Sequence, residues 1–501
     1  LDEAVEPSPP AFAAGWQLGE PDLVVRMPDA LAVPAEGPDI VRNFVVPVAV
    51  ERLRFVAAVE IRPGSAAVHH AVLGVDPTRR SRAADLRDAE PGFPGMTLGA
   101  AAPPDGHFLG WTPGKTVRQN PDGLAWRLRP GDDLVLQLHA VPTGKPERVR
   151  PEIGFWFTEV PTERVYDLVM LFSEEIDIAP GDDDFVLTDH VVLPVPVTLH
   201  AIYPHAHYVC RRMRATATTP DGVERILFAI DDWDFDWQDD YRYREPIALP
   251  AGTRVAIEYV YDNSDANPNN PIRPPRRVRF GQDSADEMGT LTLSVTLDDP
   301  GDRPALELAV VERDLEKLPD AWNLLLKKGR LERERGRFNV AAAAIDRACR
   351  ISPGAPDVWF ERGLLAEVRG RGDDAISDYG RALEVDPDFA PAHLQLGAIR
   401  GRRGEPERAL AHFEAAVRAL PNVAAAHNNV ATANFALGRL GPAERHYRRA
   451  VALDPGHFGA WFNLGRVLLA EERRAEAKQA LQRAAALRPD ERAVQELLRR
   501  L

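Results

Sequence analysis

Histidines are the residues of this chain whose type and spacing best fit metal chemistry. Eight of the 13 histidines lie between His69 and His207, and most of these fall in three short clusters. The clusters are His69-His70, the histidine of Gln137-Leu138-His139, and the pair in His205-Ala206-His207. Imidazole is a good ligand for zinc, copper, iron and nickel, so the clusters predict a site for a transition metal without naming it.

The spacing within each cluster limits how its imidazoles can share an ion. Side chains of a strand alternate between its two faces, so His205 and His207 would lie on one face. His69 and His70 would point to opposite faces of a regular strand. They can bind one ion together only where the strand bulges or ends.

Met288 favours copper over the other metals. It follows a polar, Pro- and Asn-rich stretch, 262–275, and it is one of only five methionines in the chain. A thioether is a soft ligand that suits Cu(I) and contributes little to zinc. The competing interpretation is that Met288 only fills the core, as methionine commonly does.

Other potential ligands fit the pattern less well. We expect His107, His190 and His200 to be hydrogen-bonded structural residues or partners of the ligands. His200 could replace a ligand if the strand register shifted. Cys210 could supply a thiolate, but the HxH pair and Met288 already form a complete set.

These motifs resemble those of the copper type II, ascorbate-dependent monooxygenases, a family that includes the peptidylglycine α-hydroxylating and dopamine β-hydroxylating enzymes. The resemblance covers roughly Gly15 to Asp298. It includes the HH, QxH, HxH and Met motifs and the strings QLHAVPTGKPE, PHAHYVCRRM and YDNSDANPNNP.

The resemblance implies two jelly-roll-like β-sandwich domains that each hold one copper ion across a water-filled cleft. It assigns His69, His70 and His139 to an electron-transfer copper. It assigns His205, His207 and Met288, the catalytic set, to the copper where dioxygen binds. The implied reaction is hydroxylation of a C–H bond with dioxygen and ascorbate or a similar one-electron reductant.

Two positions depart from the pattern of the peptide-amidating relatives. Tyr203 stands where those relatives have a substrate-binding Arg, two residues before the HxH pair. Thr292 stands where they have a Tyr, four residues after the Met. The cysteine bridges of the animal enzymes are also absent, and the substrate, a small molecule or a peptide, need not be a peptidylglycine.

The first 300 residues have the pattern of β structure. Short apolar runs are separated by Pro and Gly, and many runs alternate in polarity, which predicts sandwiches or barrels. The clearest runs are Phe44–Val50, Leu134–His139, Val191–Ile202, Arg254–Tyr261 and Thr290–Leu297. The acidic stretch Asp231–Asp240 has aromatic residues at alternate positions and is predicted to be a strand, not a calcium loop.

Three hundred residues exceed one comfortable sandwich, so we predict two. The predicted organisation is a flexible segment 1–14, copper domains 15–160 and 161–300, and a linker 301–320. Segment 1–14 is Pro- and Ala-rich and lacks the basic-then-apolar pattern of a signal peptide, so no targeting segment is expected in it.

The C-terminal third is an internal repeat. Prolines recur every 34 residues from Pro353 to Pro489, and alanines keep the same period from Ala348 to Ala484. This period resembles the tetratricopeptide repeat, and it predicts five helix pairs over 321–489 with a capping helix at 490–501. The five histidines here, and Cys349, are predicted to pack between helices.

Composition limits the remaining possibilities. The chain has 501 residues, 45% hydrophobic and 27% charged, which is ordinary for globular domains. Its net charge of −15 is uneven: residues 321–501 hold 30 Lys and Arg against 23 Asp and Glu, so the acidic excess lies in the first part. This balance argues against nucleic acid as a partner. No run approaches the roughly 18 apolar residues of a membrane helix.

Two functions of different classes remain. The first is a copper monooxygenase whose repeats recruit a peptide or protein; the second is a non-catalytic copper-binding or assembly protein that works through its repeats. A zinc hydrolase is a third and weaker interpretation, because it leaves Met288 without a role. Solvent-exposed copper and dioxygen chemistry favour a periplasmic or exported location.

Overall fold

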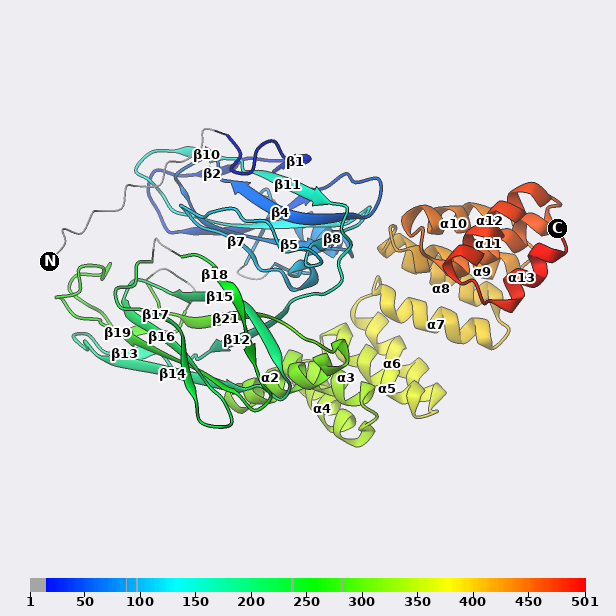
Figure 1. Cartoon of the computed structure of the whole chain (residues 1–501). Helices are drawn as coiled ribbons and strands as arrows, with labels where there is room; N and C mark the ends of the chain where they lie inside the picture. The colour runs from blue at the N-terminus through cyan, green and yellow to red at the C-terminus, as the bar shows by residue number, and fades with distance from the viewer. Residues whose placement is uncertain (1–14, 87, 96–97, 236–237, 282, 284) are drawn as a thin grey trace. The chain divides into compact units, whose positions relative to one another are not determined.

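The computed structural model describes residues 15–501 except 87, 96–97, 236–237, 282 and 284. The chain divides into two compact units, Leu1–Leu306 and Glu307–Leu501. The first unit is built mostly of strands and the second of helices (Figure 1). The coarse prediction of β structure followed by a helical repeat is therefore confirmed, whereas the jelly-roll connectivity of the strands stays a prediction.

The first half of the strand unit contains three sheets. Their strand orders are β1-β11-β4-β8, β6-β3-β9-β5-β7 and the pair β10-β2. The strands are β1 Leu23–Arg26, β2 Leu31–Val33, β3 Ile40–Pro47, β4 Arg54–Arg62, β5 Val68–Asp76, β6 Phe93–Pro94, β7 Leu109–Trp111, β8 Trp126–Leu128, β9 Asp133–Ala140, β10 Glu147–Val149 and β11 Glu152–Thr158. A short helix α1, Arg80–Asp85, and a 3-10 turn η1, Pro104–Gly106, lie between strands.

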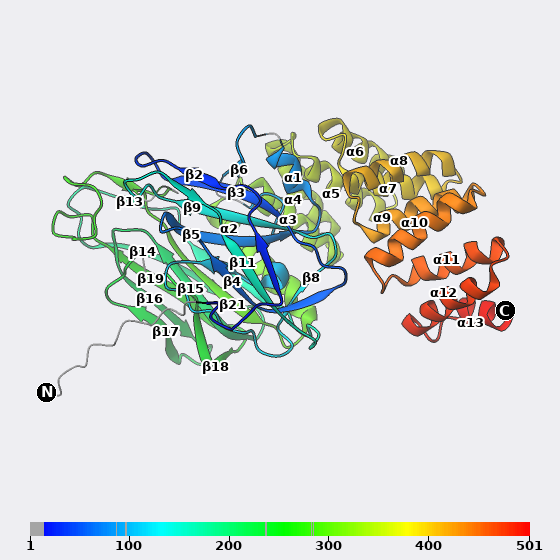
Figure 2. The same cartoon turned by 90° about the horizontal axis from the view of Figure 1, so that it is seen from above.

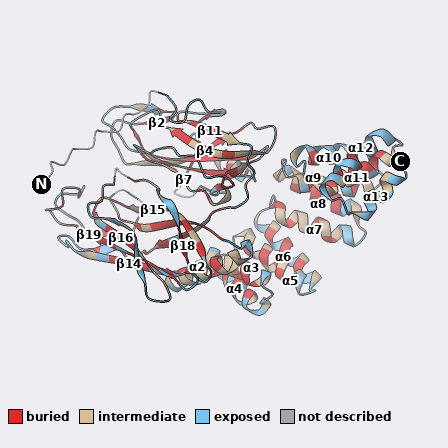
Figure 3. Ribbon diagram, in the orientation of Figure 1, coloured by how far each residue is buried: buried red, intermediate tan, exposed pale blue. Residues whose placement is uncertain are grey.

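One core joins the two larger sheets of this half. Ile61 and Phe155 from one sheet and Leu73 and Leu136 from the other belong to the same cluster of buried side chains. Buried and more exposed residues alternate over much of β4, whereas every residue of β9 is buried; Figure 3 shows buried segments in red beside tan ones. The alternation follows from the two-residue period of a strand, which places successive side chains on opposite faces of the sheet.

The second half of the strand unit repeats this plan. Its sheets have the orders β12-β21-β15-β18, β14-β19-β16-β17 and β13-β20. The strands are β12 Asp167–Phe172, β13 Asp177–Ile178, β14 Phe185–Val192, β15 Val197–Ala206, β16 Cys210–Thr218, β17 Glu224–Ile230, β18 Tyr241–Leu249, β19 Arg254–Tyr261, β20 Val278–Arg279 and β21 Gly289–Thr296. Figure 2 shows both halves from above.

Two predicted strands are wrong in detail. Val191–Ile202 is not one strand: β14 ends at Val192 and β15 begins at Val197, because the two prolines between them interrupt backbone pairing. The described residues of Asp231–Asp240 form a loop instead of a strand. Trp233 and Phe235 are nevertheless buried there, so the aromatic pattern reports burial; Trp237 lies outside the described residues.

The second unit consists of helices that follow one another in pairs. They are α3 Trp322–Glu334, α4 Phe338–Ile351, α5 Pro356–Val368, α6 Gly372–Val385, α7 Ala390–Arg402, α8 Pro406–Ala419, α9 Ala424–Ala436, α10 Leu440–Leu453, α11 Phe458–Ala470, α12 Arg474–Leu487 and α13 Arg492–Arg499. The pairs α3–α4 to α11–α12 match the five predicted repeats, and α13 matches the predicted capping helix.

Small residues let the two helices of a pair approach closely. A Cβ atom added at Gly363 would lie 2.5 Å from the ring of Tyr379, and one at Gly397 would lie 2.5 Å from the ring of Phe413. The turn inside a pair uses a left-handed glycine, as at Gly370 with φ +74°, and Glu472 adopts φ +59° at the same position of the last pair. The period in the sequence thus reflects helix contact and turn geometry.

The segment predicted as a linker, 301–320, is mostly helical. A 3-10 turn η2, Pro300–Asp302, leads into helix α2, Arg303–Lys317. Leu308, Val311 and Leu315 lie at helical spacing and pack in one cluster, which explains why this segment folds. Among the described helices, none is both long and apolar enough to cross a membrane.

Candidate metal centre

Three histidines converge at neighbouring strands of the five-stranded sheet. His69 and His70 lie on β5, His139 lies on β9, and the two strands pair antiparallel with His70 opposite His139. The register shifts between Val68 and His70, so the irregularity that the HH pair requires is present at His69. Ligand atoms of the three residues all lie within 4.8 Å of one another.

The ring atoms that face one another are the Nδ1 nitrogens. Nδ1 of His70 lies 3.2 Å from Nδ1 of His69 and 3.3 Å from Nδ1 of His139. Nε2 of His139 donates to Oδ2 of Asp39 at 2.9 Å, which leaves its Nδ1 with a lone pair. Burial, followed by the charges of His139 and His69, holds the pKa of His70 well below its ordinary value, so this imidazole is neutral and able to bind a metal.

The second histidine pair lies where β15 ends. His205 is on the strand and His207 follows it by one residue, with ring centroids 5.2 Å apart. Nδ1 of His205 donates to Oε1 of Gln238 at 2.6 Å, and Nδ1 of His207 donates to the carbonyl oxygen of Asp286 at 3.0 Å. Both imidazoles therefore present Nε2 as the free donor atom. Burial lowers the pKa of His205, and it lowers that of His207 to about 3.

Met288 is held opposite His207 by its backbone. Strands β15 and β21 pair with Ala206 opposite Gly289, so the next step of this register places Met288 across from His207. The buried Glu287 carboxylate accepts hydrogen bonds from the backbone N–H groups of His207, Val209 and Met288 at 2.8 to 2.9 Å. Burial raises the pKa of Glu287 to about 8, although these N–H groups act in the opposite direction.

The two donor sets fit copper. The first offers imidazole nitrogens of three histidines within 4.8 Å of one another, and the second offers two Nε2 atoms beside a thioether residue. Nitrogen ligands suit both oxidation states of copper, and a thioether favours Cu(I). The residues present therefore fit one copper ion in each set.

Phe235 contacts both sets. Its ring stacks on His69 with centroids 4.5 Å apart and contacts His207 edge-on at 5.4 Å. The implied water-filled cleft is therefore occupied at this point by an aromatic side chain. The ring is there because the acidic loop turns its aromatic residues inward, while Asp232 and Asp234 stay exposed.

Sequence reasoning missed four residues that organise the site: Asp39, Phe235, Gln238 and Glu287. Glu287 directly precedes Met288, so its place in the motif was the signal that could have identified it. Asp39 and Gln238 meet their histidines across 100 and 33 positions of sequence, respectively. Only the tertiary fold reveals those pairings.

The remaining candidates have other surroundings. Both ring nitrogens of His107 face carbonyl oxygens, of Pro104 at 3.0 Å and of Leu124 at 2.7 Å. Nε2 of His200 lies 2.9 Å from the hydroxyl of Thr296, and His190 is exposed on β14. The thiol of Cys210 is buried and its pKa is raised well above the ordinary value by burial.

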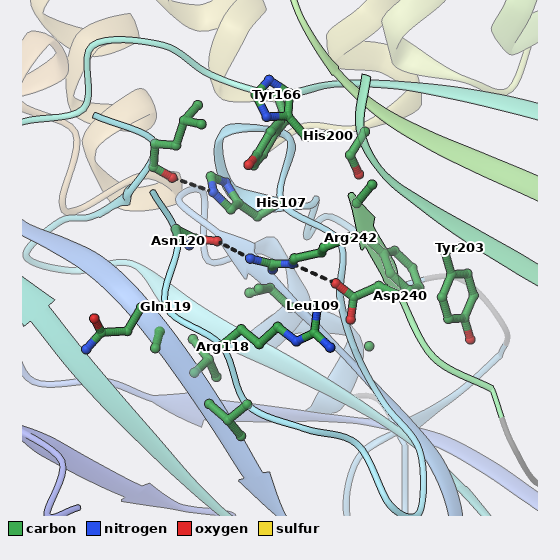
Figure 4. Close-up of a pocket in the computed structure, with 18 of the residues that line it drawn as sticks. His107, Leu109, Arg118, Gln119, Asn120, Tyr166, His200, Tyr203, Asp240 and Arg242 are labelled. Carbon is green, nitrogen blue, oxygen red and sulfur yellow. Dashed lines mark hydrogen bonds and ion pairs between the residues drawn. The ribbon is translucent and has the colours of Figure 1, made fainter. Parts of the chain in front are cut away.

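A pocket of about 820 Å³ lies beside β15, with His200 to Tyr203 among its lining residues. Tyr203 lines it, two residues before His205 on the same face of β15, and packs against Phe108 at 4.6 Å. Figure 4 shows Arg242 between Asn120 and Asp240, to which it donates hydrogen bonds at 3.2 and 2.9 Å.

The lining of this pocket has an excess of positive charge. Its acidic residues are Glu60 and Asp240, and its basic residues are Lys115, Arg118, Arg164, Arg242 and Arg244. Lys115 and Arg242 both pair with Asp240, and Glu60 pairs with Arg62. The remaining arginines leave the pocket favourable for an anion.

Tyr203 and Thr292, the two positions that differ from the pattern of the peptide-amidating enzymes, are neighbours. The register of β15 and β21 places them directly opposite each other, and His205 is opposite Thr290. Paired residues of antiparallel strands share a face, so the two replacements alter one patch of the wall beside the histidines.

Comparison with known proteins concerns the helical unit. Residues 309–498 match the family model of the cilia and flagella-associated protein 70 C-terminal domain, a tetratricopeptide-repeat model. The helical unit is a tetratricopeptide-repeat domain. No curated protein sequence matches the chain significantly.

Several solved structures are similar to the tetratricopeptide-repeat domain. YrrB, described as a tetratricopeptide-repeat protein with an unusual peptide-binding site, is 20% identical, with 39% of this chain and all of YrrB covered at a TM-score of 0.33. MamA from Desulfovibrio magneticus RS-1 is 20% identical, with coverage of 34% and 98% and a TM-score of 0.31. PilF of Pseudomonas aeruginosa is 16% identical, with coverage of 34% and 77% and a TM-score of 0.32.

Proposed function

We propose that the strand unit is a copper-dependent monooxygenase that hydroxylates a C–H bond of its substrate with dioxygen and ascorbate or a similar one-electron reductant. The observation that carries this proposal is the convergence of two histidine sets, one from each half of the strand unit, on the Phe235 ring. Two bound copper ions would supply dioxygen activation at His205, His207 and Met288 and a second electron from the His69 set.

The chain's own residues orient these ligands. Asp39 and Gln238 fix the tautomers of His139 and His205 through the hydrogen bonds described above. Glu287 ties the backbone of His207 to that of Met288, so the two ends of the catalytic set move together. Phe235 and Trp233 exclude water from the space beside the imidazoles.

The substrate we propose is a small anionic molecule, or a peptide with an anionic end, that also carries an apolar part. The unbalanced arginines of the pocket would bind the anion, and Trp111, Tyr166 and Tyr203 would contact the apolar part. The closeness of Tyr203 to His205 in sequence and on one face would place the reacting carbon near the catalytic set.

The tetratricopeptide-repeat domain would recruit a peptide or protein partner, the usual role of such helical arrays. A periplasmic or exported location fits this proposal, because the cytosol keeps its thiols reduced and soft thiolates compete for Cu(I).

Metal content and oxygen consumption test the proposal. We expect two copper ions per chain in the strand unit and oxygen uptake with ascorbate that depends on an arylalkyl carboxylic acid but not on its methyl ester. His205→Ala should abolish the uptake, whereas the exposed His190→Ala should not change it. Tight binding of zinc with hydrolysis in the absence of oxygen would refute it.

The second candidate, a copper-binding or assembly protein, is favoured by the family match of the tetratricopeptide-repeat domain. It predicts the same copper content without substrate-coupled oxygen uptake. A broad panel of carboxylic acids, none of which stimulates uptake, would support this second function over the first.

A further inference from the structure

One position in four successive repeats and in the capping helix donates a hydrogen bond to the same kind of acceptor. Trp359, His393, His427, Trp461 and Gln495 each lie six residues after a repeat proline, and a side-chain nitrogen of each donates to that proline's carbonyl oxygen. The distances are 2.8 to 3.1 Å. In the two histidines the donor is Nε2, so Nδ1 is left with its lone pair.

A second histidine faces that lone pair in both repeats. Nδ1 of His393 lies 3.0 Å from Nδ1 of His412, and Nδ1 of His427 lies 2.9 Å from Nδ1 of His446. Each pair joins the first and second helices of one repeat, α7 with α8 and α9 with α10.

The pairing is specific to these two repeats. The positions equivalent to His412 and His446 are Asp378 and Ala480 in the repeats that have Trp359 and Trp461. A histidine therefore replaces tryptophan in the first helix only where a histidine also stands in the second. Helix packing alone does not require this correlation, because alanine at 480 packs well opposite tryptophan.

Three of the four imidazoles have a lowered pKa, and three are within reach of water. Burial lowers the pKa of His412, His427 and His446, and three of the four side chains are only half-buried. Nearby Arg400 and Arg445 also lower these pKa values. Their positive charge disfavours a hard cation such as Ca²⁺, so a bound ion would have to be held by nitrogen donors.

The separation of the nitrogens fits one coordination geometry. Two nitrogens about 2.0 to 2.1 Å from a metal and at a right angle to each other are about 2.9 Å apart. That angle belongs to the square-planar or tetragonal coordination of Cu²⁺ and Ni²⁺, whereas tetrahedral zinc would hold its ligands farther apart. The same distance also fits an N–H···N hydrogen bond between the two rings. An experiment must therefore distinguish a metal site from a hydrogen bond.

We propose that His393–His412 and His427–His446 are two chelating sites for divalent copper or nickel in the tetratricopeptide-repeat domain, each completed by water. These sites are independent of the copper monooxygenase proposed above. They lie about one repeat apart, and they add up to two ions per chain to those of the strand unit.

The proposal can be tested in the full chain by replacing each histidine pair with the residues at the equivalent positions of another repeat, Trp461 and Ala480. His393→Trp with His412→Ala recreates the Trp461 and Ala480 arrangement, keeps the bond to the proline carbonyl and removes both Nδ1 donors. His427→Trp with His446→Ala does the same in the next repeat. Titration with Ni²⁺ should show one fewer bound ion for each double variant and two fewer for the combination.

The controls separate this result from misfolding and from the strand unit. His412→Gln and His446→Gln keep a hydrogen-bond donor beside Nδ1 and should also lose the ions, and circular dichroism should show unchanged helix content. His69→Ala with His205→Ala should leave the two repeat ions bound. If the folded double variants bound as many Ni²⁺ ions as the unchanged protein, the proposal would be overturned and the pairs would be identified as hydrogen bonds.

Discussion

At the scale of single residues, the site depends on groups that orient the ligands as much as on the ligands. His139, His205 and His207 each have one ring nitrogen fixed by an oxygen acceptor, so the other nitrogen is available. Without these acceptors, either tautomer would be open to each ring, and the donor atoms would not be aligned in advance.

Met288→Ile should abolish hydroxylation while leaving about one copper ion per chain tightly bound. The substitution removes the soft sulfur ligand and keeps an apolar side chain, and it does not touch the three histidines of the first set. Copper analysis after dialysis, together with oxygen uptake, measures both effects. Loss of both ions to the same degree would contradict the division into two sets.

Asp39→Asn should weaken copper binding at the His69, His70 and His139 set by roughly 10- to 100-fold. The amide can no longer stabilise the positive charge that His139 acquires on binding a metal. Competition with a copper chelator gives the affinity, and the exposed Asp29→Asn provides a matched control. Equal affinities in the two variants would show that Asp39 has no orienting role.

At the scale of elements, irregularities of the strands and turns position the site. The register shift in β5 brings His69 and His70 to one side, and the carboxylate of Glu287 joins the ends of β15 and β21. In the helices, left-handed glycines reverse the chain inside each repeat. Substitutions at these irregular positions should therefore alter the placement of the site residues or the turns inside the repeats.

Asp105→Asn should destabilise the strand unit by about 2 kcal/mol at neutral pH. Burial alone would raise the pKa of Asp105, but hydrogen bonds from Arg127 outweigh it and hold this pKa below its ordinary value. The stabilisation is therefore full above pH about 4 and is lost as the pH falls through the lowered pKa. Urea unfolding of the unchanged protein and of the Asp105→Asn variant gives their free energies of unfolding. The difference between the two values should become smaller from pH 7 to pH 2.5.

Gly370→Ala should lower the stability of the repeats by about 1 kcal/mol, because alanine is strained at φ +74°. Gly380→Ala, inside helix α6 with open space around its Cα, should raise it by a similar amount. Urea titration followed by circular dichroism at the helical band compares the two. The same sign for both changes would contradict the assigned turn.

At the scale of the whole molecule, the chain combines two units with different sources of stability. The strand unit is held together by pairings between strands that are far apart in sequence, such as β1 with β11. In contrast, each helix pair contacts mainly its neighbours in sequence. Local contacts of this kind make repeat stability nearly additive. Metal removal should therefore affect the two units differently.

Copper should raise the unfolding temperature of the strand unit alone in a variant that lacks the repeat histidine pairs. An ion present at 100 times its dissociation constant stabilises the native state by about 2.7 kcal/mol. Differential scanning calorimetry with and without a chelator measures the shift. A shift of the helical transition in that variant would contradict separate metal sites.

The sequence by itself determined what depends on local pattern. The 34-residue period predicts the helix pairs because each repeat packs mainly on its neighbours, and alternating polarity predicts that the first part is built of strands. The HH, QxH and HxH motifs likewise predict candidate ligands, because the ability of imidazole to bind a metal depends only on the residue type. Even the need for a bulge at His69 follows from strand geometry alone.

Only the tertiary structure decided which distant residues meet. Asp39 reaches His139 across 100 positions of sequence, and Phe235 contacts histidines from both halves of the strand unit. The pairing of Tyr203 with Thr292 and of His393 with His412 also depends on register and helix packing. Such contacts are set by how whole sheets and helices pack, which no local pattern specifies.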